Sequence, residues 1–249
     1  MSAKKTQNSL GASGSPTKVP TKASDASVAP LLDVRDLKVH FPIEKGILLR
    51  RRVGWLKAVD GVSFSVARGE ALGLVGESGC GKSTLGKAIM KLVPVAGGEI
   101  VVEGVDIAPL NREQLTNMRR KVQMIFQDPY SSLNPRLRIG DALREPLVSF
   151  GLCPDRRSLD GRVAELLAAV GLSADAAERY PHQFSGGQRQ RAAIARALAS
   201  EPSLLICDEP VSALDVSIKG QVVNLLLDIN QRLGVTVLFI SHEIGRAHV

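Results

Sequence analysis

The sequence has no apolar run of eighteen residues, only three cysteines and 4% aromatic residues. The missing run argues against a membrane-spanning helix, and residues 1–30 lack the apolar core of a secretory signal, so we expect a cytoplasmic chain. The cysteines, Cys80, Cys153 and Cys207, are odd in number and lack metal-ligand spacing. This pattern disfavours both a disulfide framework and a zinc site, and we expect reduced thiols.

Positive charge is in modest excess, with a formal net charge of +7. Part of it is clustered, in lysines of the first 22 residues and at Arg50–Arg52. Such clusters suit nucleic acid or anionic lipid, but a solvated loop explains them more simply. Because no aromatic-rich RNA signature accompanies the charge, we favour the solvated loop and expect no nucleic-acid partner.

The chain consists of two regions that differ in amino-acid composition and pattern. Residues 1–30 are mostly Ser, Ala, Thr, Lys and Pro, with almost nothing large to bury, which predicts a disordered tail. From Leu31 onward, apolar and polar residues alternate over 31–41 and again over 56–66, which indicates half-buried strands. We therefore expect one folded domain over 31–249.

Continuous apolar runs predict the second kind of strand in this domain. They indicate strands at 71–75, 121–126, 203–208 and 235–240, and we expect the last three to be buried parallel strands rather than edge strands. Helical periodicity begins near Lys82 and recurs at 161–172 and 222–234. Together these patterns predict an α/β fold with an inserted helical portion at about 128–200.

The stretch "GESGCGKS" at Gly76–Ser83 matches G-x-x-x-x-G-K-[ST] and stands between a predicted strand and a predicted helix. Its glycines let backbone N–H groups turn toward phosphate oxygens, and Lys82 adds a fixed charge. Ser83 can ligate magnesium, and Thr84 can reach a more internal phosphate. The alternative is a glycine-rich turn before an ordinary helix. The predicted phosphate-binding residues are Gly76, Glu77, Ser78, Gly79, Cys80, Gly81, Lys82, Ser83 and Thr84, with Cys80 as a backbone donor rather than a nucleophile.

Two acids follow the apolar run in "SLLICDEP". Asp208 stands at the carboxyl end of a predicted strand, where it would hold magnesium, and Glu209 would polarise the water that attacks the γ-phosphate. Gln127 and His242 also follow predicted strands. A lone Gln or His is more often a surface or core residue. At this end of the sheet, however, Gln127 would sense magnesium and water, and His242 would hydrogen-bond the γ-phosphate.

These motifs occur together with "FQDPYSSLNPR", "FSGGQRQR", "SALD" and "SH" in an order that resembles the ATP-binding subunits of ABC transporters, from Leu31 to His242. Phe184, "RGE" at 68–70, "REPL" at 144–147 and the insertion ending in "KAVDGVSF" are similar to oligopeptide and dipeptide importers, in particular to their F-type ATPase subunit. The resemblance implies a P-loop NTPase (RecA-like) core with an N-terminal antiparallel β portion and an inserted α-helical subdomain.

The stretch "HQFSGGQRQR" at 182–191 contains glycine, serine and arginine but no acid and no cysteine. The resemblance implies that the nucleotide sits between two head-to-tail domains, so this stretch would cover ATP bound by a partner's phosphate loop. The residues so implied are Ser185, Gly186, Gly187 and Gln188, with Asp215 bridging the two sites. Phe41 is placed to stack on adenine, although a core position is an equal alternative.

The implied function is ATP binding and hydrolysis, with ATP and Mg²⁺, coupled to uptake of oligopeptides or dipeptides. The implied partners are a paralogous ATPase subunit or a second copy, two transmembrane permease subunits that dock at Tyr130–Pro135, and indirectly an extracytoplasmic peptide-binding protein. The expected location is the cytoplasmic face of the inner membrane. Alternatives are an ABC ATPase of DNA repair or translation, and nickel, glutathione or opines as solute. The "SGGQ" at 185–188 argues against a P-loop kinase or GTPase.

Family members continue beyond the histidine, whereas this sequence ends in "IGRAHV" at 244–249. That hexapeptide back-translates to ATC GGA AGA GCA CAC GTC, which resembles a sequencing adapter. We therefore expect the genuine sequence to diverge after about residue 243 and the natural protein to be longer. Reading the coding DNA tests this expectation.

Overall fold

The computed structural model describes residues 29–45, 51–128 and 132–242. Several expectations from the sequence lie outside these ranges: the disordered state of most of the tail, the docking residue Tyr130 and the divergent end from about 243. The remaining expectations, on strands and helices, concern residues that the structure describes.

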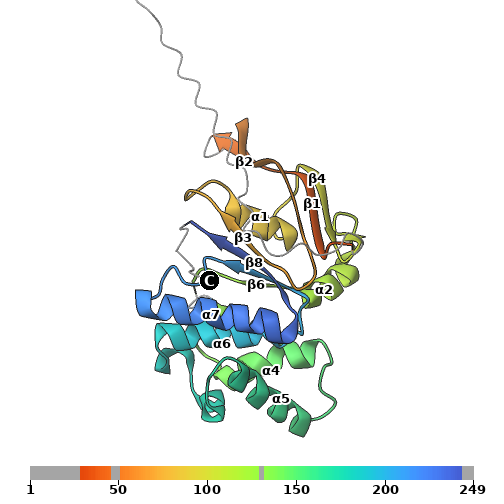
Figure 1. Cartoon of the computed structure of the whole chain (residues 1–249). Helices are drawn as coiled ribbons and strands as arrows, with labels where there is room; N and C mark the ends of the chain where they lie inside the picture. Colours follow the sequence, from red (N-terminus) through yellow and green to blue (C-terminus); the bar gives the residue numbers. More distant parts are fainter. Residues whose placement is uncertain (1–28, 46–50, 129–131, 243–249) are drawn as a thin grey trace, which may run out of the picture.

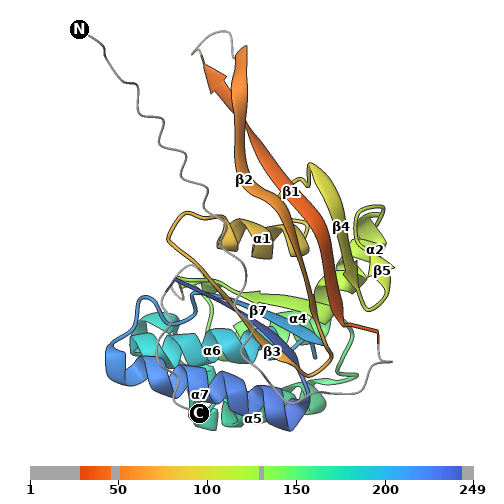
Figure 2. The same cartoon turned by 45° about the horizontal axis from the view of Figure 1, so that its top comes forward.

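The alternating segments form an antiparallel sheet in the order β2-β1-β4-β5. Its strands are β1 (Leu32–Lys45), β2 (Arg51–Val66), β4 (Gly97–Val102) and β5 (Val105–Asp106). β1 pairs with β2 from Leu32↔Val66 as far as Lys45↔Arg51, and the outer part of this ribbon projects beyond the sheet (Figure 2). The prediction of strands from alternation is confirmed, with both strands longer than their alternating segments.

The apolar runs form a parallel sheet in the order β3-β8-β7-β6. The strands are β3 (Ala71–Val75), β6 (Val122–Ile125), β7 (Leu204–Asp208) and β8 (Thr236–Ser241). The expectation that the runs at 121–126, 203–208 and 235–240 avoid the edges is wrong for the first of them, because within the described residues β6 pairs with β7 alone. β6 reads as a central strand because α2 and α6 contact it and bury most of its side chains.

Helices cover both faces of the parallel sheet (Figure 1). On one face, α1 (Lys82–Ile89) lies between the two sheets, and α2 (Arg112–Lys121) precedes β6. On the other face lie α6 (Gly186–Leu198) and α7 (Val216–Leu233), with α4 (Ile139–Ser149) and α5 (Arg156–Ala169) farther out. Two short 3₁₀ turns, η1 (Ala174–Glu178) and η2 (Pro181–Gln183), join α5 to α6.

The helical elements α4, α5 and α6 fall within the segment predicted as an insertion, and its bounds as a separate subdomain stay a prediction. α5 begins before the expected Gly161 because Asp155 caps it: the Asp155 carboxylate accepts from the Ser158 backbone N–H at 2.9 Å. At the other end of the chain, α7 stops at Gly234, whose φ of 66° terminates the helix.

Strand β7 separates two apolar cores. Leu204 and Ile206 belong to the core shared with α1 and the antiparallel sheet, whereas Leu205 and Cys207 belong to the core shared with the outer helices. Side chains alternate across a strand, so β7 is buried from both faces. The observed architecture is the expected α/β fold, and it presents the carboxyl ends of four parallel strands at one edge.

Candidate functional site

A cavity of about 520 Å³ opens at the carboxyl ends of the parallel strands. Open α/β sheets bind their ligands at this edge. The cavity brings together most of the residues predicted from the sequence: Phe41, Ser78, Gly79, Cys80, Gly81, Lys82, Ser83, Thr84, Gln127, Glu209 and His242. Residues that lie more than 160 positions apart in the sequence therefore meet in one site.

The loop before α1 depends on glycine at its last position. Gly81 caps the helix with a φ of 98°, and a Cβ there would lie 2.0 Å from the carbonyl oxygen of Ala58. A left-handed backbone in contact with a neighbouring strand admits no other residue without a shift. The β2 strand thus fixes where helix α1 begins, and with it the position of the phosphate loop.

Lys82, the first residue of α1, is 8% exposed. Its ammonium group donates to the carbonyl oxygens of Gly76 and Glu77, at 2.6 Å each. Carbonyl groups satisfy its hydrogen bonds but do not cancel its charge, and within the described residues no carboxylate lies at ion-pair distance from it. A largely buried cation at the start of a helix favours an anionic ligand such as phosphate.

Asp208 stands at the end of β7 and is 5% exposed. The Ser83 hydroxyl donates to Asp208 Oδ1 at 2.7 Å, so two of the three predicted magnesium ligands, Ser83, Asp208 and Gln127, are in contact. Hydroxyl, carboxylate and the amide oxygen of Gln127 are the hard oxygen donors that Mg²⁺ prefers. In the described part of the chain no cluster of three or more His, Cys, Asp and Glu residues is placed to hold a metal. This incomplete set fits a cation that takes its remaining ligands from substrate phosphates and water.

Glu209 is in contact with both other predicted catalytic residues. Gln127 Nε2 donates to Glu209 Oε2 at 2.9 Å, and His242 Nε2 lies 3.5 Å from the same oxygen. The Glu209 side chain is 13% exposed, against 40% for His242. Glu209 also has a φ of 48°, uncommon for a residue other than glycine, and its backbone N–H donates to the Ile240 carbonyl at 2.9 Å. Backbone strain of this kind is frequent at functional sites.

The residues Ser185–Gln188 do not line this cavity. They form the start of α6, where Ser185 Oγ accepts from the Gln188 N–H at 3.3 Å and Gln188 Oε1 accepts from the Ser185 N–H at 3.1 Å. The glycines pack against the start of α7: a Cβ at Gly187 would lie 2.6 Å from Ile218 Cγ2. Asp215 caps α7 and is also outside the cavity. We call Ser185–Gln188 the signature segment. It therefore does not complete the candidate phosphate site of its own chain.

Three lining residues were missed from the sequence: Leu56, Lys57 and Ala58. They reach the cavity because β2 pairs with β1, which places Leu56 opposite Phe41. Phe41 itself both lines the cavity and packs against the core around α1, and its stacking on adenine stays a prediction. The alternation of β2 was visible in the sequence, but the face it turns to the phosphate loop was not.

A second cavity, a groove of about 490 Å³, lies between α4, α6, β6 and the end of α1. Arg196 of α6 crosses its wall, donating to the Ser132 carbonyl and to Glu145 of α4, at 3.0 Å each. Ser132 falls within the stretch 130–135 that was predicted to dock a partner, and it lines the groove.

Among the described helices, none combines the length and apolarity needed to cross a membrane.

The chain is similar in sequence and in fold to several known proteins. A family model described as "ABC transporter" matches residues 59–212. The chain is 50% identical over 221 residues to "Oligopeptide transport ATP-binding protein AppF" of Bacillus subtilis, covering 88% of this chain and 67% of that protein. It is 54% identical over 216 residues to "Glutathione import ATP-binding protein GsiA" of Escherichia coli O157:H7, covering 87% of this chain and 34% of that protein.

A solved structure, the "post-hydrolysis state of the ATP-binding cassette MJ0796 bound to ADP and Pi", is similar with a TM-score of 0.72 and 29% identity, covering 86% of this chain and 88% of that one. The chain spans about two thirds of the length of the first relative and about one third of the second. The ordered motifs, the phosphate loop before α1 and these likenesses agree. The chain belongs to the ABC transporter family.

Proposed function

We propose that this chain is the ATP-binding and ATP-hydrolysing subunit of an ABC importer that takes up peptides. The observation that carries the proposal is the meeting of Lys82, Ser83 and Glu209 in one cavity, with Asp208 bonded to Ser83, while the signature segment lies outside that cavity. One chain thus offers a phosphate loop, a carboxylate base and a second surface that fits another chain's nucleotide.

The chemistry assigned to the site is attack of water on the γ-phosphorus of ATP, with cleavage of its bond to the ADP oxygen. Lys82 draws the phosphates into the loop by its uncompensated charge. Glu209 accepts the proton of the attacking water, and Gln127 orients the Glu209 carboxylate through their hydrogen bond. His242, at the same carboxylate, is placed to hydrogen-bond the γ-phosphate. Ser83, Asp208 and Gln127 would hold Mg²⁺, which when bound neutralises developing phosphate charge.

A pair of cassettes is the proposed working form. Ser185–Gln188 stand at the start of α6, where a serine hydroxyl, glycine N–H groups and a helix N-terminus favour an anion. Because this segment lies outside its own chain's cavity, it would cover ATP held by a paralogous subunit or a second copy. The solved relative's title describes a dimer with ADP and Pi, which supports this form. Asp215, at the adjoining start of α7, would bridge the two sites.

The groove between α4 and α6 is the proposed docking site of a transmembrane permease subunit. The groove is lined by residues of β6, the strand that leads to Gln127 of the phosphate site, and by residues of α6, the helix that begins with the signature segment. Two such cassettes would bind two permeases at the cytoplasmic face of the inner membrane and would be served by an extracytoplasmic peptide-binding protein. The names of both relatives describe transport or import, which supports this assignment.

Peptides are the proposed solute class, and glutathione is the second candidate. The relative at 50% identity is named for oligopeptide transport and the one at 54% for glutathione import. Glutathione is itself a small peptide, so both names fit a solute with peptide bonds. We expect the choice between them to be made by the permeases and the binding protein.

Replacing the base tests the proposal. Glu209→Gln keeps the shape of the side chain but removes its basicity, so ATP binding should persist while turnover falls at least about 100-fold. ATP should then hold two cassettes together, measured as ATP-dependent dimers in sedimentation. Lys82→Ala should abolish nucleotide binding. Glu201→Gln, at another strained glutamate with a φ of 55° but paired with Arg162 outside the cavity, is the matched control and should hydrolyse normally.

Unchanged turnover in Glu209→Gln would contradict the assignment of Glu209 as base. Full turnover by a strictly monomeric preparation, insensitive to replacement of Ser185 or Gly187, would contradict the two-cassette form.

A further inference from the structure

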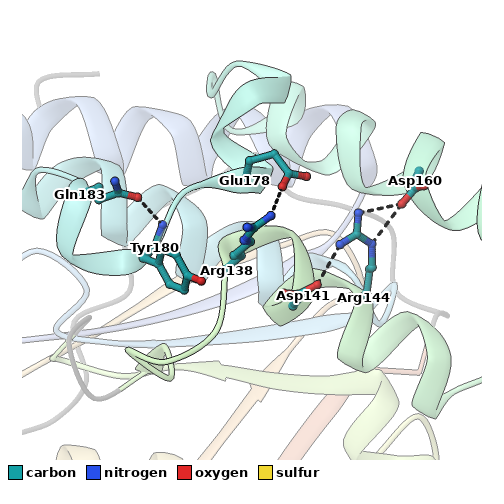
Figure 3. A network of polar contacts seen from close by, with 7 residues as sticks. All are labelled: Arg138, Asp141, Arg144, Asp160, Glu178, Tyr180 and Gln183. Carbon is teal, nitrogen blue, oxygen red and sulfur yellow. Dashed lines mark hydrogen bonds and ion pairs between the residues drawn. The ribbon is translucent and has the colours of Figure 1, made fainter.

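Three consecutive residues just before the signature segment are held by the start of helix α4 (Figure 3). The Arg138 guanidinium forms an ion pair with Glu178, and its central carbon lies 5.8 Å from the ring centroid of Tyr180. The next residue of α4, Ile139, donates its backbone N–H to the Arg179 carbonyl at 2.9 Å. An ion pair, a cation–π contact and a backbone hydrogen bond thus converge on 178–180.

The turn that follows is closed on itself and leads directly into the signature segment. The Tyr180 backbone N–H donates to Gln183 Oε1 at 2.7 Å, and the Gln183 N–H donates to the Tyr180 carbonyl at 2.9 Å. From the other side, Arg189 of α6 donates to the Pro181 carbonyl at 2.8 Å. Displacement of Tyr180 would therefore be passed to Ser185 rather than absorbed by a loose loop.

Phe184, the last residue before Ser185, is anchored separately. It is 3% exposed and belongs to the outer-helix core, and the Arg179 guanidinium carbon lies 4.3 Å from its ring centroid. Arg179 also donates to the Gln183 carbonyl. The position of Ser185 is therefore set by two neighbours, the core beneath Phe184 and the start of α4.

Helix α4 also reaches the groove with its opposite end. Glu145, Pro146 and Ser149 line the groove, and Glu145 is paired with Arg196 of α6. One helix therefore contacts the proposed docking groove at its carboxyl end and the turn before the signature segment at its amino end.

We propose that Arg138 is a positioning residue for the signature segment Ser185–Gln188, acting through Tyr180 and Glu178. It sets where that segment lies relative to α4, and hence relative to whatever occupies the groove. The inference rests on the proposed function, because the position of the segment matters only if it covers the nucleotide of a second cassette.

The alternative is that Arg138 merely stabilises the helical region. The side chains of Arg138 and Glu178 are 48% and 65% exposed, and exposed ion pairs contribute little to stability. A large kinetic effect of replacing Arg138 would therefore not be explained by unfolding.

Arg144, two turns further along α4, is the matched control (Figure 3). It donates to Asp141 at 3.0 Å and to Asp160 at 2.7 Å, so it joins α4 to itself and to α5. Both of these hydrogen-bond partners, Asp141 and Asp160, lie outside the 178–184 turn. Replacing it removes a comparable arginine network without releasing that turn.

The test compares Arg138→Ala, Arg144→Ala and the unsubstituted chain. Binding of a fluorescent ATP analogue reports the chain's own phosphate loop, and steady-state hydrolysis gives kcat and KM. For Arg138→Ala we expect a Kd within about twofold of the unsubstituted chain and a kcat lower by about tenfold, the kind of loss that follows from a misplaced reacting group. Arg144→Ala should keep both values at a similar melting temperature.

Two further variants separate positioning from folding. Arg138→Lys keeps the charge opposite Glu178 but loses the flat guanidinium over Tyr180, so it should restore part of the kcat. Glu178→Gln weakens the same contact from the other side without truncation and should lower kcat in the same direction. Adding Tyr180→Ala to Arg138→Ala should cost less than the two single losses combined.

A normal kcat in both Arg138→Ala and Glu178→Gln would overturn the inference. So would an equal loss of kcat in Arg138→Ala and Arg144→Ala. In both cases the proposed function stands, because the unsubstituted chain binds and hydrolyses ATP. An unsubstituted chain that fails to bind ATP would overturn the proposed function and this inference with it.

Discussion

Gln127 donates its side-chain amide to the carboxylate of Glu209, with 2.9 Å between Nε2 and Oε2. Gln127 stands two residues after the end of β6 and Glu209 directly after β7, the two strands that pair in parallel at this edge. A base is useful only when its carboxylate faces the water, and this hydrogen bond limits its rotation.

Replacing Gln127 by Ala should therefore lower kcat by about 10- to 100-fold, because an oriented polar group is lost at the reacting centre. The Kd for nucleotide should change little, since the phosphate loop is untouched. Gln123→Ala, on β6 itself, is the control: its amide donates to the Arg119 carbonyl at 2.6 Å, away from Glu209. Equal kcat values for the two variants would argue against an orienting role for Gln127.

Gly81→Ala should abolish nucleotide binding. Its added Cβ would meet the Ala58 carbonyl oxygen at 2.0 Å in a backbone with a φ of 98°. Gly79→Ala is a graded control, because Gly79 also has a positive φ, of 80°, but a Cβ there meets nothing within 4 Å. It should cost about 1 kcal/mol of backbone strain and keep some binding. Titration calorimetry with ATP measures the difference, and similar affinities would show that the contact with β2 is unimportant.

Thiol reagents should inactivate the chain through Cys80. Cys80 is exposed in the phosphate loop, whereas burial raises the pKa of the Cys207 thiol and keeps it protonated and unreactive. We expect one fast modification that blocks ATP binding and is slowed by ATP itself. Cys80→Ala should bind ATP and resist the reagent. Inactivation of Cys80→Ala at the original rate would place the sensitive thiol elsewhere.

Glu103 should give the protein an acid-sensitive component of stability. Its carboxylate bonds Lys121 at 2.6 Å and Arg68 at 2.8 Å, which ties the turn after β4 to the end of α2 and the turn before β3. The hydrogen bond from Lys121, followed by that from Arg68, outweighs partial burial and lowers the pKa of Glu103 from 4.5 to about 2. Because the folded-state pKa is below the unfolded one, the contribution is complete above about pH 4.5 and is lost as the pH falls to about 2.

Glu103→Gln should therefore destabilise the chain by about 1 to 3 kcal/mol at pH 7 and lessen the loss of stability between pH 4.5 and 2. Urea unfolding over this pH range measures both effects. Glu99→Gln, at an exposed carboxylate paired only with Arg35 in the described contacts, is the control. A Glu103→Gln variant as acid-sensitive as the parent would contradict the assignment.

The sequence predicted the elements of this site better than their arrangement. Alternation and apolar runs identified the strands, and "GESGCGKS" and "CDEP" identified the ligands, because each depends on neighbours in sequence. Leu56, Lys57 and Ala58 were missed because their role depends on which face of β2 meets the phosphate loop, a tertiary fact. β6 was taken for a central strand because helices, not strands, bury its outer side.

The role of Arg138 was likewise invisible in the sequence. An arginine before a helix is commonplace, and its partners Glu178 and Tyr180 follow about forty residues later. Only the packing of α4 against the η1 turn brings them together.

The close approach of Gly81 to the Ala58 carbonyl group affects which nucleotides the candidate site can accept. Phe41 lies opposite Leu56 on the paired strand, and Leu56 is two residues before Ala58, so the β1–β2 ribbon carries both the residue expected to stack on adenine and the residue that abuts the phosphate loop. Under the proposed function, this pairing would fix the distance between the base and the phosphate loop, whereas stacking on an aromatic ring distinguishes one base from another only weakly. GTP should therefore be tolerated far better than an ATP analogue lengthened between its sugar and its phosphates.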